Sequence, residues 1–91
     1  MSYRDTIHDD QSIERCFCAD VDTDELVWHR DRRDREVKIL DGADWFIQID
    51  NQMPIELIVD KTYSIVRNVY HRLMKGENAS DLKIQIIENH D

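Results

Sequence analysis

Hydrophobic and polar residues alternate along much of the chain with the period of two that is typical of β-strands. In residues 35–40, Val37 and Ile39 fall on one face, whereas the charged Glu36 and Lys38 fall on the other. By the same pattern and by β-propensity, we predict further strands at residues 26–31, 45–50, 55–59, 63–66, 69–74 and 82–88. For residues 12–19, a strand and a short helix both stay open.

The predicted strands are short and follow one another at intervals of roughly eight to ten residues, separated by turn signals such as Asp41-Gly42. The connections are too short for the crossover helices that a parallel sheet requires. We therefore predict an all-β fold, a small antiparallel β-barrel or jelly roll. Residues 1–24 are expected to form an irregular or helical N-terminal arm and a first edge element, and residues 25–91 the barrel, within one domain.

The composition fits a single small soluble domain. The chain has 91 residues, of which 41% are hydrophobic, and its net charge of −8 argues against nucleic acid or an anionic membrane as a partner. No apolar run approaches the roughly 20 residues of a transmembrane helix, and residues 1–10 do not resemble a signal peptide. Cys16 and Cys18 are too close for an unstrained disulfide, so we expect reduced thiols and a cytoplasmic protein.

Two predicted strands carry candidate metal ligands. Alternation places His29 and Asp31 on the face of Val27, and places His71 on the face of Val69. If these apolar faces are the interior, two imidazoles and one carboxylate converge there, a set that suits a divalent transition metal with open coordination positions. A plain alternative is a hydrogen-bonded His29–Asp31 pair and a half-buried His71 satisfied by the backbone.

With this pattern, residues 28–88 resemble a minimal cupin domain. The first cupin motif has the form H-x-H, then an acidic ligand and a glycine turn, and here reads His29-x-Asp31, Arg35 and Gly42. The second motif ends in a histidine, here His71. The resemblance implies a small jelly roll, usually dimeric, that binds Fe, Mn, Zn or Ni. The chain departs from it where Asp31 replaces the second histidine and where Arg35 replaces the glutamate ligand.

Arg35 and Gln48 are further candidates for ligand binding. Arg35 would either pair with Asp31 inside the barrel or clamp a carboxylate of a bound molecule, and Gln48 would orient a ligand or face solvent. Trp28 and Tyr70, on the outer faces of their strands, suggest a homodimer interface. The first hypothesis is a small cupin with a divalent-metal site that acts as a metal-dependent enzyme, such as an oxygenase or isomerase, on a small polar molecule. The alternatives are a non-catalytic cupin that binds a small ligand or a protein, and an acidic interaction module.

Overall fold

Short strands account for almost all of the regular structure in the residues that the structure describes. A computed structural model describes residues 3–88, and the predicted all-β class is confirmed. The strands are β1 (Tyr3–Ile7), β2 (Ile13–Phe17), β3 (Arg35–Asp41), β4 (Trp45–Ile49), β5 (Ile55–Glu56), β6 (Thr62–Ile65), β7 (His71–Lys75) and β8 (Leu82–Glu88). A single 3₁₀ turn, η1 (Thr23–Glu25), precedes β3. In residues 3–88, no helix has the length and apolar character needed to cross a membrane.

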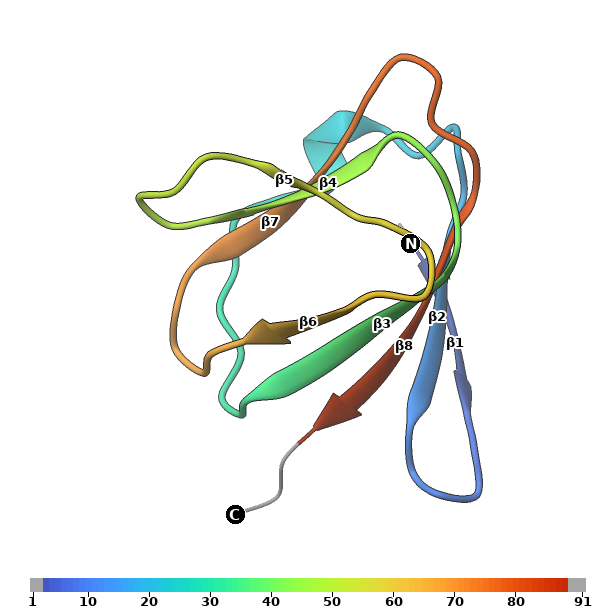
Figure 1. The fold of residues 1–91 in the computed structure, drawn as a ribbon, viewed down its shortest axis with the longest axis vertical. Helices are drawn as coiled ribbons and strands as arrows, with labels where there is room; N and C mark the ends of the chain where they lie inside the picture. The colour runs from blue at the N-terminus through green and yellow to red at the C-terminus, as the bar shows by residue number, and fades with distance from the viewer. Residues whose placement is uncertain (1–2, 89–91) are drawn as a thin grey trace.

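The strands form two antiparallel sheets that face each other in a jelly roll (Figure 1). The larger sheet has the order β1-β2-β8-β3-β6, and the smaller sheet has the order β5-β4-β7. The sheets are not closed into a continuous barrel, which corrects the predicted barrel. The reason is that β5 has two residues and pairs with β4, so it offers too little backbone to join the smaller sheet to β6.

The core lies between the sheets and follows the predicted alternation. Val37 and Ile39 on β3 are buried, and the intervening charged residues are exposed. The same alternation buries three aliphatic side chains of β8. Trp45 on β4 is fully buried, and its indole Nε1–H donates to the carbonyl of Ser80 at 2.6 Å. Its polar atom is therefore satisfied in the core.

The N-terminal segment is a β-hairpin. The expected irregular or helical arm is wrong for residues 3–7, which form β1 and pair with β2 in the register Tyr3↔Phe17 to Ile7↔Ile13. Residues 12–19, left open between strand and helix, contain the strand β2, which also pairs with β8. Hydrogen bonding to the edge of β2 thus overrides the polar character of residues 4–6.

Residues 26–31 do not form the predicted strand. They follow η1, which Asp22 caps by accepting a hydrogen bond from the amide of Asp24 at 3.0 Å, and they run on as an irregular segment. One isolated bridge, between His29 and His71, ties this segment to β7. The predicted strand at 55–59 is likewise reduced to the two residues of β5.

Candidate metal centre

Two distant backbone segments, one at His29 and one at His71, pair to form the frame of the site. The amide of His29 donates to the carbonyl of His71 at 3.0 Å, and the amide of His71 donates back to the carbonyl of His29 at 2.9 Å. Two residues further along, the carbonyl of Asp31 accepts from the amide of Asn68 at 2.7 Å. Residues 29–31 therefore lie along the start of β7, on the side opposite β4.

Both imidazole rings are oriented by the same kind of hydrogen bond to the backbone. Nδ1 of His29 lies 3.0 Å from the carbonyl oxygen of Val27, and Nδ1 of His71 lies 3.0 Å from the carbonyl oxygen of Val69. A carbonyl only accepts, so each Nδ1 carries the proton and donates it. In the neutral ring, Nε2 then presents a lone pair. Histidine ligands of protein metal sites are oriented and fixed in one tautomer by such a bond.

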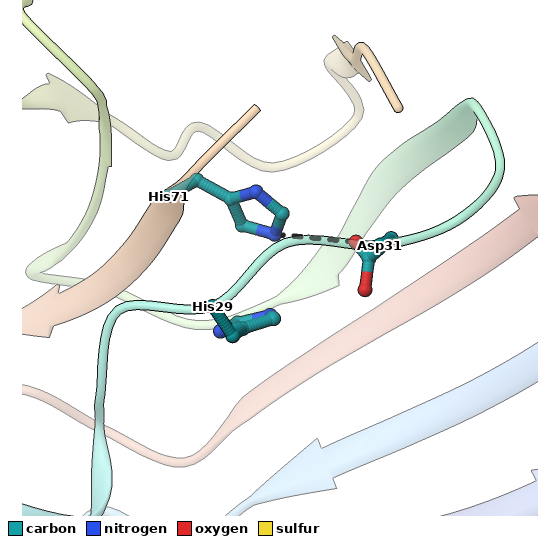
Figure 2. Close-up of side chains that lie close together, drawn as sticks. All are labelled: His29, Asp31 and His71. Carbon is teal, nitrogen blue, oxygen red and sulfur yellow. Dashed lines mark ion pairs between the residues drawn. The ribbon is translucent and has the colours of Figure 1, made fainter. Parts of the chain in front are cut away.

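The free side of the His71 ring meets the carboxylate of Asp31. Figure 2 shows Nε2 of His71 directed at Asp31, whose Oδ2 lies 3.3 Å away, with the ring of His29 below them. One potential ligand atom from each of the three residues lies within 4.8 Å of the others. The structure thus brings together the three side chains that the sequence selected.

The contact between Asp31 and His71 leaves a buried carboxylate oxygen unsatisfied. Among residues 3–88, Oδ2 of Asp31 is buried without a hydrogen-bond partner, although it lies 3.3 Å from Nε2 of His71, because with the proton on Nδ1 this nitrogen has none to donate. Burial lowers the pKa of His71, and the neighbouring His29 lowers it further, so the neutral ring is favoured. A carboxylate oxygen then faces a nitrogen lone pair. A cation between them would satisfy both atoms, so the residues fit a metal ion.

The three residues differ in their exposure. His71 is 4% exposed and belongs to the core, whereas His29 is exposed and Asp31 lies between these extremes. The predicted reason for their convergence was only partly right, because Val27, expected inside, is 59% exposed. The backbone bridge, and not an inward strand face, positions His29. The exposed side of His29 would leave a route from solvent to the site.

Arg35 lies next to the trio. Its Nη1 is 3.4 Å from Oδ1 of Asp31 and its Nη2 is 3.7 Å from Glu88, so a charged guanidinium stands beside the candidate ligand. Gln48 has other partners: it accepts from Nε of Arg72 at 3.0 Å and donates to the carbonyl of Gln52 at 3.2 Å. The structure therefore brings Arg35 to the trio and engages the amide of Gln48 elsewhere.

Known proteins resemble this chain in fold and not in sequence. No family model matches the sequence, and no curated protein matches it. Solved structures do match. A cupin-like protein from Thermotoga maritima superposes with a TM-score of 0.69 at 17% identity, covering 92% of this chain and 65% of that one. The chain has the cupin fold. A cupin-2 domain containing protein from Shewanella frigidimarina gives a TM-score of 0.65 at 20% identity, over 97% of this chain and 80% of its own.

A third match is a structure of Fe(II)-HppE with the alternative substrate (S)-1-HPP. It has a TM-score of 0.68 at 12% identity, over 96% of this chain and 48% of that one. The chain therefore spans about two-thirds of the Thermotoga protein and about half of HppE. The TM-scores establish the cupin fold of the chain. At identities this low, they carry no information about its chemistry.

A cavity of about 330 Å³ opens beside the trio. His29, Asp31 and Arg35 line it together with Arg15 and Tyr3, which the sequence had not singled out. A signal for Arg15 exists in the sequence, because alternation along β2 puts it on the face of the core residue Phe17. For Tyr3 no such signal exists, because its position depends on the unforeseen pairing of β1.

Proposed function

We propose that this chain is a metal-binding cupin in which His29, Asp31 and His71 hold a divalent transition metal. The observation that carries the proposal is the convergence of the two rings and a carboxylate. Each Nδ1 is bonded to a backbone carbonyl two residues earlier, Nε2 of His71 lies 3.3 Å from Asp31, and one ligand atom of His29 lies within 4.8 Å of the ligand atoms of the other two residues. Histidine ligands of metal sites almost always donate their other ring N–H in this way. A buried histidine that only packs can make the same bond, so the convergence of both rings with a carboxylate is what favours a metal.

We further propose that the cupin is an enzyme, an oxygenase or isomerase, acting on a small polar molecule. Two neutral imidazoles and one carboxylate on one side of an ion suit Fe(II), and also accommodate Mn, Zn or Ni. The bound ion would supply Lewis acidity and open positions for a substrate. Fe(II)-HppE, which shares the fold, is described as holding Fe(II). In this chain, buried His71 fixes the site, and exposed His29 borders the cavity through which a substrate would enter.

The experiment is a metal titration of the chelator-treated protein, in which Fe(II), under anaerobic conditions, Mn(II), Ni(II) and Zn(II) are followed by calorimetry and elemental analysis. One ion per chain is the expected stoichiometry. His71→Gln should weaken binding at least tenfold, because it removes a ligand. The matched control is His8→Gln, since His8 is an exposed histidine that contacts Glu14 and lies outside the trio. Absence of stoichiometric binding, or equal loss in both variants, would reject the metal site.

A non-catalytic cupin that binds a small ligand or a protein partner is the second candidate. The contact between Arg35 and Asp31 favours it, because a guanidinium beside the carboxylate can neutralise it in place of a metal. In that case Arg35→Gln should increase the affinity for metal, since the competing cation is gone. Unchanged or weaker metal binding in this variant would count against such competition.

We also propose that the chain forms a homodimer through the surface around Trp28 and Tyr70. Their side chains are 40% and 45% exposed. Arginine side chains stack on both rings, with Arg72 above Trp28 at 4.7 Å and Arg30 above Tyr70 at 5.4 Å. Analytical ultracentrifugation should detect a dimer that Trp28→Glu weakens. A wild-type monomer at all accessible concentrations would exclude this proposal.

A further inference from the structure

We infer that the cavity beside the trio binds a small carboxylate, and that the guanidinium groups of Arg35 and Arg15 receive its charged group. The inference rests on the proposed metal site, because it assigns a ligand class to the space next to that site. It adds Arg15, on β2, to the functional residues of the chain.

The lining of the cavity has two parts of different character. One part consists of the two arginines together with Glu25, His29 and Asp31. The other part is mostly apolar and is formed by Tyr3, Phe17, Leu26, Val27 and Leu73. The volume, about 330 Å³, lies within the range of small-molecule sites. A molecule with an anionic head and a short apolar body matches both parts.

Arg35 has hydrogen-bonding capacity that its neighbours do not use well. Its Nε is buried and has no hydrogen-bond partner within the described part of the chain. Its contacts to Asp31 and Glu88, at 3.4 and 3.7 Å, are longer than the roughly 2.7–2.9 Å of a charge-assisted hydrogen bond. A carboxylate in the cavity, which Arg35 lines, would offer the Nη groups of Arg35 a closer acceptor than Asp31 and Glu88 provide.

Arg15 is fixed in position by other residues. Its Nε and Nη2 donate to the two carboxylate oxygens of Asp5 at 2.8 and 3.0 Å, and its guanidinium lies over the ring of Tyr3 at 3.9 Å from the centroid. These contacts engage two of its three nitrogens and hold the group in the wall of the cavity. A guanidinium positioned in this way binds an anion with little further loss of side-chain entropy.

The charge of the lining depends on the metal. Two arginines and two carboxylates, Glu25 and Asp31, line the cavity, so its formal charge is balanced. A divalent ion on the trio adds two positive charges and creates a site that favours an anion. Metal and carboxylate should therefore raise each other's affinity, by the same factor in both directions.

The test uses mandelate, a 2-hydroxy acid with an apolar body, and its neutral amide, mandelamide. Binding is followed through the Nε–Hε NMR signals of the arginines, in metal-free and in Zn(II)-loaded protein. We expect mandelate to bind the loaded wild type at least tenfold more tightly than mandelamide, and more tightly than mandelate binds the metal-free protein. Arg35→Gln should lose at least tenfold in mandelate affinity. The control Arg67→Gln, at an exposed arginine outside the cavity, should stay within twofold of wild type.

The outcomes separate the two proposals. Equal affinity for acid and amide in the wild type overturns the inference, and this comparison needs no variant. Full retention of mandelate binding by a folded Arg35→Gln protein overturns it as well. If Zn(II) binds and mandelate shifts no arginine signal, the carboxylate site is rejected while the metal site stands. If Zn(II) does not bind but mandelate is still preferred over mandelamide, the carboxylate site is supported and the metal site is rejected.

Discussion

Metal binding should stabilise the fold, because the ligands come from segments that only the folded chain brings together. Asp31 and His29 lie in an irregular segment before β3, and His71 begins β7. The unfolded chain therefore offers no comparable site. A ligand that binds only the folded state at a hundred times its dissociation constant stabilises by about 2.7 kcal/mol. For a domain of this size, each kcal/mol raises Tm by roughly 4–8 °C, so the expected increase is about 11–22 °C.

Asp31→Asn tests the reasoning with almost no change in side-chain size. If the variant binds metal a hundredfold more weakly, the same concentration of ion stabilises it by only about 0.4 kcal/mol, or roughly 2–3 °C. The metal-free variant should stay within about 1 kcal/mol of wild type, because the new amide can donate to Nε2 of His71 and so replace a contact that is not a hydrogen bond.

The assay is thermal unfolding followed by circular dichroism, with and without metal and after removal of metal by a chelator. His8→Gln serves as the control that should keep the full increase in Tm. An increase below about 2 °C for the wild type at saturating metal, or an equal increase in Asp31→Asn, would refute the proposed coordination.

Three further predictions concern the scaffold. Gly42→Ala should lose more than about 1 kcal/mol in urea unfolding, because Gly42 has φ +135° and its new Cβ would meet Leu82 at 2.9 Å; an unchanged midpoint would contradict this. Ile39→Val should cost about 0.5–1.5 kcal/mol and Ile39→Ala about 2–5 kcal/mol, since this side chain is fully buried, and equal costs would be inconsistent with that packing. The hydroxyl and then the amide of Ser12 lower the pKa of Asp10 below 3.8. The contribution of this carboxylate to stability should thus be present above pH 3.8 and be lost as the pH falls through the lower folded value. Ser12→Ala should raise that pKa in an NMR titration, and no change would exclude the hydroxyl as the cause.

The parts of the fold that could be predicted are those in which one face of a strand is buried. Along β3, alternation of Val37 and Ile39 with charged residues reports directly on the core, and the strand forms where it was expected. β1 could not be predicted in this way. Most of its side chains are exposed, so its formation depends on pairing with the edge of β2, which leaves no hydrophobic period in the sequence.

The sequence predicted which residues form the candidate site, but not which backbone contacts bring them together. Residues 26–31 contain strong β-formers, yet their backbone finds a partner in β7 only at His29, so the strand does not form. His29 and Asp31 still reach His71, because that one bridge and the hydrogen bond from Asn68 to Asp31 align the two segments. Tertiary pairing of this kind cannot be derived from local propensity.

Arg35 is the residue at which this site departs most from the charge pattern of the cupin motif. The cupin resemblance leads us to expect an acidic ligand at this position, and a second carboxylate would bring a divalent ion with its ligands to charge balance. Replacing that carboxylate by a guanidinium changes the local charge by two units in the positive direction. The same substitution removes a metal ligand and supplies an anion receptor 3.4 Å from Asp31. A site altered in this way would bind metal less tightly than a four-ligand cupin. It would also depend on an anionic ligand to complete its charge, so the affinity for metal should rise when a carboxylate is present.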